Sequence, residues 1–490
     1  MALTSPAALP DTTSEELVSL LARQRADFRR EGSPSAEVRR TRIDLLLLAI
    51  MENAEEIARA LEEDFGSRPT AFSLNADVMS LLDEAEYVRT HLESWMSPVE
   101  AEVGDGLSVT VEKRPKGVVG VIGPWNAPVR LTVQPAVDAL AAGNRVMIKF
   151  SDFAPHTGEV FARAVADKLP PEVVTVVLGG RPTAEAFTRL EFDHIMLTGS
   201  PQIGRIVAAE AGRNLVPVTL ELGGKNPVVI ARDADLADAA GRVAASRLNN
   251  GGQVCLCPDY VFVPQERIDE FSAAYASYVA QHYPDYADNA AVISLINEAT
   301  VHRITGLVDD AAAKGARVQT LATDEGDRRL PDIAARRIAP TLVYGVTDEM
   351  AIAHEEIFGP VLAVLTYTDL DQAIDYIESR PHPLVAYYYG DDGPDFREFV
   401  RRTTSGAVNR NDMALHLASP DIPFGGIGQS GMGTYRGRAG FDTFTYQRPI
   451  ASSSLPFSVA AMTNGPFTAA DRDDLLLAIK AQIELVRARL

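Results

Sequence analysis

The sequence holds two cysteines, and one of them lies in a segment where a reactive thiol could form. Cys255 belongs to the glycine-rich run Asn-Asn-Gly-Gly-Gln-Val-Cys-Leu-Cys-Pro, residues 249–258, which also contains Cys257. A thiol on such a turn can lie open to solvent and near backbone N–H groups, which lower its pKa and favour the nucleophilic thiolate. The alternative is that both cysteines are small buried apolar residues. Cys255 is therefore a candidate nucleophile whose role depends on its neighbours.

Two further segments carry side chains that could assist such a thiol. Glu221 ends an apolar, β-branched run and is followed by Leu-Gly-Gly-Lys-Asn-Pro. A carboxylate at the C-terminal end of a strand, beside a backbone that permits close approach, fits a general base. Asn126 lies between two prolines in Gly-Pro-Trp-Asn-Ala-Pro, and a rigid amide of this kind is suited to stabilising an oxyanion. Taken alone, each would more often be a surface glutamate or a turn asparagine.

Helices and strands alternate along the chain in a way that could position these groups. The first hundred residues space their apolar positions as helices do, and residues 107–113 alternate as a half-exposed strand. Beyond them, apolar β-branched runs alternate with helical stretches such as 158–168 and 203–211, which favours parallel sheets covered on both faces. We therefore expect an α/β fold with two sheet domains in sequence. The predicted strands are 117–122, 145–149, 173–178, 194–197 and 217–221, then 227–230, 260–263, one near 318, 341–343 and 361–365.

Composition narrows the classes of partner. The chain has 490 residues and a formal net charge of −21, which argues against nucleic acid or an anionic membrane surface as the main partner. No apolar run approaches the ~20 residues that span a bilayer, and the N-terminus lacks the pattern of a secretory signal. With only two cysteines, one residue apart, a disulfide is geometrically poor, and we expect a reducing, cytoplasmic setting. The eight histidines show no paired metal-ligand spacing, so we expect no metal site.

Five motifs in order resemble the aldehyde dehydrogenase superfamily. They are GPWNAP (123–128), ELGGKNP (221–227), GQVC (252–255), EEIFGP (355–360) and PFGGIGQSG (423–431), and the resemblance runs from about Arg39 to about Phe444. The 34-residue separation of Glu221 and Cys255 is also the one the family keeps. Details such as Phe-Asp-His-Ile (192–195) and Gly-Met-Gly-Thr-Tyr (431–435) are similar to the branch with class 3 and coniferyl aldehyde dehydrogenases.

The resemblance implies a role for each catalytic residue. The Cys255 thiolate would attack the aldehyde carbon, and the Asn126 amide with the Cys255 backbone N–H would hold the oxyanion. The adduct would release hydride to the nicotinamide and leave a thioester, which Glu221 would hydrolyse by activating water. Cys257 would be a neighbour and not a second nucleophile. An acylating enzyme, a semialdehyde dehydrogenase, a thiol hydrolase with a histidine base and an inactive homologue remain as alternatives, and Glu221 favours water over coenzyme A as the acceptor.

The resemblance also implies an NAD(P) site. Thr-Gly-Ser-Pro-Gln-Ile-Gly (198–204) is expected to place a turn at a helix start, where N–H groups favour a pyrophosphate. Lys149 and Asp152 would face the adenine ribose, and an acidic group there favours NAD over NADP, with NADP still possible. The family pattern is changed here, because the run is Lys-Phe-Ser-Asp and a leucine precedes Thr198. The full expected cofactor set is Ile122, Pro124, Trp125, Lys149, Asp152, Gly199, Ser200, Gly204, Leu222, Glu356 and Phe358.

Domain bounds and assembly follow from the same resemblance. We expect two Rossmann-like parallel-sheet domains plus a small β oligomerisation element: residues 1–102 and 118–222 for NAD, 223–406 for catalysis, and bridging strands within 103–117 and 440–450. Residues 466–490 predict an amphipathic C-terminal helix that packs on the protein itself or on a partner subunit. The implied assembly is a homodimer, and the implied substrate is a hydrophobic or aromatic aldehyde of the coniferyl type.

Overall fold

The computed structural model describes residues 11–321, 324–462 and 464–490. They divide into two units: the chain up to Met96 together with Arg114–Tyr446, and Ser97–Lys113 together with the residues from Gln447 onward. Every residue expected in the catalytic and cofactor sites belongs to the first, larger unit. That unit is built on two sheets, and the second unit on a third.

The predicted N-terminal helices are confirmed. They begin at polar caps: the Thr13 side chain accepts from the Glu16 N–H in a capping box, and Ser35 accepts from the Val38 N–H. One π-helical turn, Leu74–Met79, interrupts the last of them. The helices are α1 (Ser14–Glu31), α2 (Ala36–Glu52), α3 (Ala54–Phe65), α4 (Thr70–Ser73) and α5 (Ser80–Met96).

The first large sheet has six strands in the order β15-β7-β6-β3-β4-β5. All neighbours are parallel except the short β15, which pairs antiparallel with β7. The five predicted strands from 117 to 221 are confirmed within about two residues at each end. The strands are β3 (Val118–Ile122), β4 (Arg145–Lys149), β5 (Val174–Val177), β6 (His194–Gly199), β7 (Val218–Leu222) and β15 (Gly431–Met432), and the connecting helices are α6 (Arg130–Ala141), α7 (Pro155–Lys168), α8 (Arg181–Thr188) and α9 (Pro201–Arg213).

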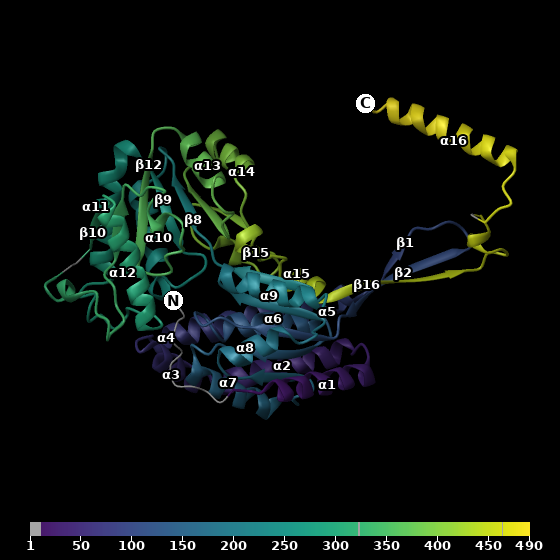
Figure 1. Cartoon of the computed structure of the whole chain (residues 1–490), viewed down its shortest axis with the longest axis horizontal. Helices are drawn as coiled ribbons and strands as arrows, with labels where there is room; N and C mark the ends of the chain where they lie inside the picture. The colour runs from purple at the N-terminus through teal and green to yellow at the C-terminus, as the bar shows by residue number, and fades with distance from the viewer. Residues whose placement is uncertain (1–10, 322–323, 463) are drawn as a thin grey trace. The chain divides into compact units, whose positions relative to one another are not determined.

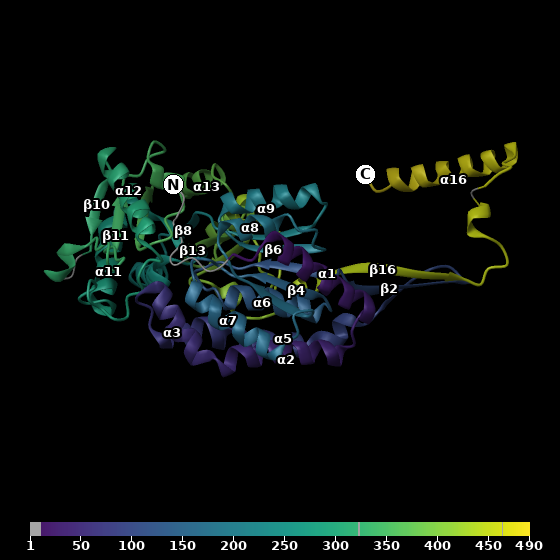
Figure 2. The same cartoon turned by 60° about the horizontal axis from the view of Figure 1, so that its bottom comes forward.

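Helices cover both faces of this sheet because successive strand residues point to opposite sides. Val119 and Val121 of β3 pack in one core with residues of α2, α3, α5, α6 and α7. Val118 packs in a second core with residues of α1, α8 and α9. Figure 2 shows these two helical layers on either side of the strands. Apolar runs of this kind are buried on both faces, as the sequence predicts.

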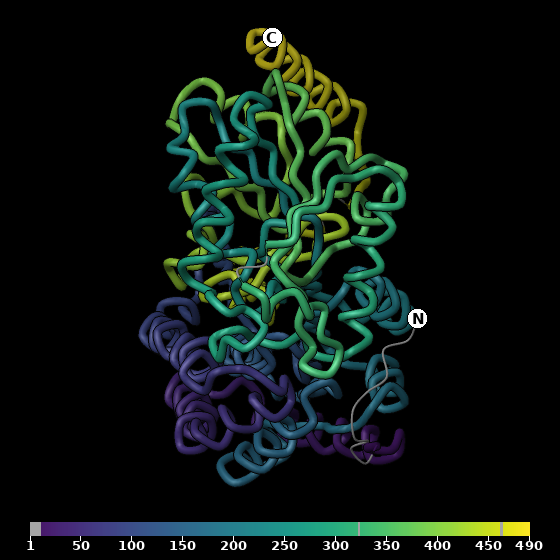
Figure 3. The backbone as a smooth tube through the Cα atoms, turned by 90° about the vertical axis from the view of Figure 1, so that its left-hand side faces the viewer, coloured from purple at the N-terminus to yellow at the C-terminus, as the bar shows by residue number. Residues whose placement is uncertain are grey.

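The second large sheet has seven strands in the order β10-β11-β12-β9-β8-β13-β14, all parallel except β10. Figures 1 and 3 show its strands and helices as the teal-to-green part of the larger unit. The strands are β8 (Asn226–Ile230), β9 (Pro258–Pro264), β10 (Arg317–Thr320), β11 (Thr341–Tyr344), β12 (Val361–Tyr367), β13 (Val385–Tyr389) and β14 (Ala407–Arg410), and the helices are α10 (Leu236–Leu248), α11 (Ile268–His282), α12 (Glu298–Ala313), α13 (Leu370–Glu378) and α14 (Pro394–Arg402).

This sheet corrects one predicted boundary. The sequence prediction ends the second sheet domain at residue 406, but β14 follows at Ala407 and pairs in parallel with β13. β13 itself is also absent from the predicted strands. Ala407–Arg410 reads Ala-Val-Asn-Arg, which has no apolar run, so its strand state depends on pairing with Val385–Tyr389 and not on its own composition.

The second unit contains a three-stranded sheet in the order β1-β2-β16 and a C-terminal helix. The strands are β1 (Val99–Ala101), β2 (Leu107–Pro115) and β16 (Thr445–Ser453). The predicted bridging segment 440–450 is partly wrong, because Gly437–Thr443 forms helix α15 before the strand begins. The predicted C-terminal helix is confirmed as α16 (Ala469–Arg487), with a capping box between Thr468 and Asp471. Within the described ranges, no helix is long and apolar enough to cross a membrane.

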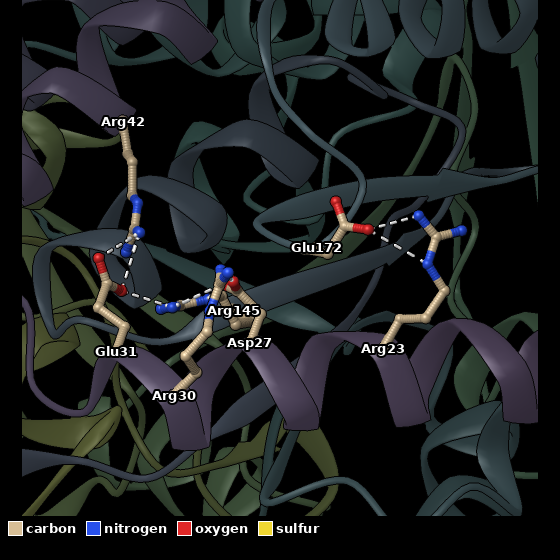
Figure 4. A network of polar contacts seen from close by, with 7 residues as sticks. All are labelled: Arg23, Asp27, Arg30, Glu31, Arg42, Arg145 and Glu172. Carbon is tan, nitrogen blue, oxygen red and sulfur yellow. Dashed lines mark hydrogen bonds and ion pairs between the residues drawn. The ribbon is translucent and has the colours of Figure 1, made fainter.

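A buried charge network ties α1 to the amino end of β4 (Figure 4). The Arg145 side chain is fully buried and donates to Asp27 at 2.8 Å and to Glu31. Arg42 of α2 donates to both oxygens of the Glu31 carboxylate, at 2.8 and 2.9 Å. Arg145 begins β4, whereas Lys149 of the expected cofactor set ends it, so this network lies at the opposite end of the strand.

Candidate active site

The expected cofactor residues collect at one edge of the six-stranded sheet. Strands β4, β3, β6 and β7 are parallel neighbours, so their carboxyl ends lie side by side. Ile122 pairs with Lys149, and Gly199 pairs with Leu222, at these ends. This is the edge at which open parallel sheets bind their ligands.

The start of α9 lies close to the end of β7. Ser200 caps the helix, and its side chain accepts from the Ile203 N–H. Gly204 is buried, and a Cβ placed on it would come within 2.7 Å of the Leu222 side chain. A glycine at this position therefore allows the helix N-terminus and the strand end to approach each other. The positive end of the helix dipole at this start suits a pyrophosphate, so these residues fit a dinucleotide.

Lys149 lies among acidic groups at the same edge. Its Nζ donates to the Phe150 carbonyl at 2.7 Å. Burial lowers the pKa of Lys149, while the carboxylates of Asp152 and Asp11 act in the opposite direction. Asp11 itself accepts from the Gly180 N–H at 2.7 Å and from the Thr183 hydroxyl at 3.0 Å, at the start of α8. The sequence prediction included Lys149 and Asp152 but missed Asp11, which no local pattern marks.

The loop that carries Cys255 is folded tightly between α10 and β9. Asn250, Gly251 and Gly252 all have positive φ, a conformation that glycine adopts freely and asparagine tolerates. Gly252 packs on the Gly359 carbonyl, where a Cβ would come within 2.3 Å. The Asn226 amide donates to the Cys255 carbonyl at 2.6 Å and to the Cys257 carbonyl at 3.0 Å. These contacts hold the Cys255 backbone in one conformation.

The lowered thiol pKa expected for Cys255 is wrong for this structure. Burial raises the pKa of Cys255 to about 12, and the carboxylates of Glu356 and Glu221 add to the rise. The reason is that a thiolate is charged, and its surroundings supply negative charge and little water. Cys255 therefore rests as a thiol at neutral pH. Cys257 is buried, and its Sγ donates to the Ser246 carbonyl at 3.1 Å, in keeping with a neighbour's role.

Glu221 is a buried carboxyl group without a hydrogen-bond partner. It lies at the carboxyl end of β7, as predicted, and its side chain is 3% exposed. Neither carboxylate oxygen has a hydrogen-bond partner among the described residues. Burial raises the pKa of Glu221 well above its ordinary value. A carboxyl group with a raised pKa is a stronger base once ionised than an ordinary carboxylate, so Glu221 fits a general base.

Asn126 is anchored to the loop of the cysteine. Its side-chain amide donates to the Gln253 carbonyl at 3.0 Å, two residues before Cys255. The Gln253 side chain is fully buried and in turn donates to the Asn250 and Ser294 carbonyls. Because an amide has two N–H groups, this contact leaves the second one to donate to a reacting oxygen.

Glu356 and Phe358 lie in a loop held by three charged side chains. Arg303 donates to the Glu356 carbonyl at 3.0 Å and to the Ile357 carbonyl at 2.7 Å. Asp259 accepts from the Ile357 N–H at 2.9 Å and is paired with Lys225. Burial raises the pKa of Glu356 to about 8, with a smaller contribution from Asp259. The Phe358 ring meets the Trp125 ring edge-on, with centroids 5.4 Å apart.

His194 lies at the amino end of β6, away from the carboxyl ends that carry the cofactor residues. It is buried, with Thr219 Oγ1 and Lys116 Nζ each 2.9 Å from its ring nitrogens, which is a structural role. In the parts of the chain that the structure describes, no group of three or more His, Cys, Asp or Glu side chains could hold a metal ion.

A family model described as the aldehyde dehydrogenase family matches residues 4–450. The chain belongs to the aldehyde dehydrogenase family. It is therefore an oxidoreductase that acts on aldehydes, in a family that uses NAD(P). The resemblance seen in the five sequence motifs is confirmed.

Known relatives cover nearly the whole of this aldehyde dehydrogenase. A coniferyl aldehyde dehydrogenase of Pseudomonas sp. (strain HR199) is 40% identical over 442 residues, which cover 90% of this chain and 92% of the relative. A probable coniferyl aldehyde dehydrogenase of Caulobacter vibrioides is 42% identical and covers 88% and 90%. A rat enzyme named aldehyde dehydrogenase, dimeric NADP-preferring, is 33% identical and covers 88% and 94%.

A solved structure confirms the α/β class and the sheet architecture. The substrate-bound state of AldH from Staphylococcus aureus superposes with a TM-score of 0.86 at 29% identity, covering 94% of this chain and 99% of that one.

Proposed function

We propose that this aldehyde dehydrogenase oxidises a hydrophobic or aromatic aldehyde of the coniferyl type to its carboxylic acid, through a thioester on Cys255. The proposal rests chiefly on the buried Glu221 carboxyl, which has no hydrogen-bond partner among the described residues and whose ionised form raises the pKa of Cys255. A base in this position activates water to hydrolyse the thioester. Hydrolysis is the step that distinguishes an acid-forming enzyme from one that transfers the acyl group to another acceptor. The substrate class is supported by the two coniferyl relatives at 40% and 42% identity.

The proposed chemistry divides the oxidation between three side chains. The Cys255 thiol loses its proton to solvent, and its sulfur bonds to the aldehyde carbon. The second Asn126 N–H with the Cys255 backbone N–H holds the resulting oxyanion. NAD(P), when held by the residues of the cofactor edge, would supply the acceptor for the hydride that leaves this carbon, so that a thioester on Cys255 remains. Glu221 then takes a proton from water as the oxygen bonds to the acyl carbon. The C–S bond breaks as the adduct collapses, and the carboxylic acid is released. The proton on Glu221 passes to the leaving sulfur, which restores the free thiol and the carboxylate.

We also propose NAD as the preferred cofactor. Asp152 was the sequence-based reason, and Asp11 supplies a second carboxylate that acts on Lys149 from the start of α8. A 2′-phosphate would add negative charge near both, which is unfavourable. Initial rates with each cofactor at saturating aldehyde test this. Equal or better kcat/KM with NADP, as the name of the rat relative suggests for that enzyme, would contradict the proposal.

The assembly and setting are proposals of the same kind. We propose a homodimer in which strands β2 and β16 bridge subunits, because all residues of β16 after Thr445 are exposed in the chain and most residues of β2 are only half-buried. We propose a cytoplasmic setting because both cysteines are free thiols, which a reducing compartment preserves.

A panel of benzaldehyde-type, cinnamaldehyde-type and long-chain aldehydes, incubated with NAD and without coenzyme A, tests the activity through NADH absorbance. Coniferyl-type aldehydes are expected to have the highest kcat/KM. Cys255→Ser should abolish turnover. Glu221→Gln should release about one NADH per subunit and then stop, with the acyl group retained on the protein by mass spectrometry. Steady turnover by Glu221→Gln, or acceleration by coenzyme A, would contradict the proposed water step.

A further inference from the structure

A buried ion pair lies outside the residues used so far. Arg68 and Asp77 face each other at 2.6 Å, with side chains 1% and 0% exposed. Arg68 follows α3, and Asp77 lies in the π-helical turn that interrupts the helix before α5. Removing two charges from water is costly, so such a pair calls for an explanation beyond its own attraction. π-helical turns are also frequent at functional sites.

The ion pair forms hydrogen bonds with both ends of the turn that contains Asn126, residues 126–130. Arg68 Nη1 donates to the Asn126 carbonyl at 3.0 Å. The second Asp77 oxygen accepts from the Val129 N–H at 3.2 Å and the Arg130 N–H at 3.3 Å. The ion pair thus connects the two ends of residues 126–130. Its two members come from segments that precede this turn by about fifty residues.

Two further contacts place this bridge at the reacting end of the site. The Asn250 amide donates to the same Asn126 carbonyl at 3.0 Å. It also donates to the Gln253 carbonyl, which accepts from the Asn126 side-chain amide as well. The guanidinium carbon of Arg68 lies 4.5 Å from the centroid of the Phe65 ring, and Phe65 packs against Trp125 with centroids 6.3 Å apart. Arg68 is therefore linked to the Asn126 turn by one hydrogen bond and, through the Phe65 ring, by packing.

We propose that Arg68 and Asp77 are positioning residues that fix the Asn126 amide for oxyanion stabilisation. The inference rests on the oxyanion role proposed for Asn126. A fixed carbonyl at Asn126 sets the backbone from which its side chain extends, and the Gln253 contact sets the amide plane. A shift of about 1 Å in such a donor can cost on the order of 100-fold in rate. Neither residue would touch substrate or cofactor.

Arg68→Lys and Asp77→Asn test this directly. Lysine keeps the charge but cannot reach Asp77, the Ser73 hydroxyl and the Asn126 carbonyl together, as the guanidinium does. We expect kcat with aldehyde to fall by about 10- to 100-fold. The KM for NAD should change by no more than about twofold, and the shape of the pH profile of kcat should stay the same. The reason is that the cofactor edge and Glu221 are not displaced.

The pair Arg145–Asp27 provides the matched control (Figure 4). It is also a buried arginine–carboxylate pair, with side chains 0% and 9% exposed, but it lies at the amino end of β4. Arg145→Lys and Asp27→Asn should lower the melting temperature and leave kcat unchanged. An equal fall in kcat for both pairs would mean that a general loss of stability, and not positioning, explains the effect.

A double-mutant comparison separates this inference from the function it rests on. In an Asn126→Ala background, Arg68→Lys should reduce kcat by no more than about twofold further, because its target is already absent. If Asn126→Ala alone keeps wild-type kcat, the oxyanion role fails. If Asn126→Ala is slow but Arg68→Lys is not, or if the two losses multiply, only the positioning role is overturned.

Should Arg68→Lys not fold, Ser73→Ala provides a second test, because it removes only the contact to Arg68 Nε. It must show a smaller loss of kcat, and a wild-type kcat there overturns the inference.

Discussion

At the scale of single residues, the pKa of the Cys255 thiol depends on its buried surroundings more than on the glycine-rich turn that carries it. The glycine-rich loop orders its backbone, yet burial raises the pKa of its sulfur, and the Glu356 and Glu221 carboxylates raise it further where they are ionised. Glu356 belongs to a loop about a hundred positions further along the chain, so the titration of the thiol depends on the tertiary structure. A nucleophile that rests as a thiol is protected from oxidation until it is deprotonated.

We predict that Glu356→Gln speeds alkylation of Cys255 at alkaline pH. The pKa of Glu356 is about 8, so at pH 9 its carboxylate is ionised and holds the thiol pKa up. Removing that charge should raise the rate with iodoacetamide about three- to tenfold at pH 9, because more thiolate is partly offset by lower nucleophilicity. At pH 6.5 Glu356 is mostly protonated, so the variant and the wild type should react alike.

Glu355→Gln is the control for this measurement. Glu355 is exposed and is not among the groups that shift the Cys255 pKa. It should leave the alkylation rate unchanged at both pH values. A rate increase that is the same at pH 6.5 and pH 9 would show that the charge of Glu356 is not the cause.

At the scale of elements, the contact between α9 and β7 sets the geometry of the cofactor edge. Ser200 starts the helix, Leu222 ends the strand, and Gly204 lets them meet. The packing is one-sided, because Gly212 on the same helix has no atom within 4 Å of the position where a Cβ would stand. Gly204 is therefore needed for the close approach of α9 to β7, whereas Gly212 is not.

We predict that Gly204→Ala raises the KM for NAD by roughly tenfold, since its Cβ would displace Leu222 or the helix by a fraction of an ångström. Gly212→Ala should leave this KM unchanged and stabilise α9 by up to about 1 kcal/mol, because alanine is the better helix former. Steady-state kinetics and thermal unfolding of both variants measure the difference. Equal NAD kinetics for the two would rule out close approach at Gly204 as a determinant of binding.

At the scale of the whole molecule, the second unit has too little interior to explain its apolar residues. Ile450 of this unit is 47% exposed, and so is Tyr446, the last residue of the larger unit, on the same face of β16. Apolar residues along an exposed sheet are typical of a surface that pairs with another chain. The same holds for the apolar residues of α16, none of which is buried in the chain.

We predict a particle of twice the chain mass in size-exclusion chromatography with light scattering. Ile450→Lys should shift the protein toward the monomer at micromolar concentration, because it places a charge on the apolar face of β16. Ala451→Lys, on the opposite face of the same strand, is the control and should have a smaller effect. A monomeric wild type, or a dimer equally indifferent to both changes, would contradict bridging through this strand.

The sequence by itself determined most of the framework around the site. Apolar runs bounded by glycine and asparagine predicted β3–β9 with Glu221 and Lys149 at strand ends, because burial on both faces leaves a pattern that is local in the chain. The run Val-Ala-Tyr-Tyr-Tyr of β13 carried a similar signal that the prediction passed over. β14 carried none, since its pairing partner makes it a strand.

Only the tertiary structure decided how the reacting groups behave. The raised pKa of Cys255 and the bridge of Arg68 and Asp77 to the Asn126 turn join segments tens to more than a hundred positions apart. Such couplings leave no periodicity or spacing in the sequence, because charge and hydrogen bonding act through space and not along the chain.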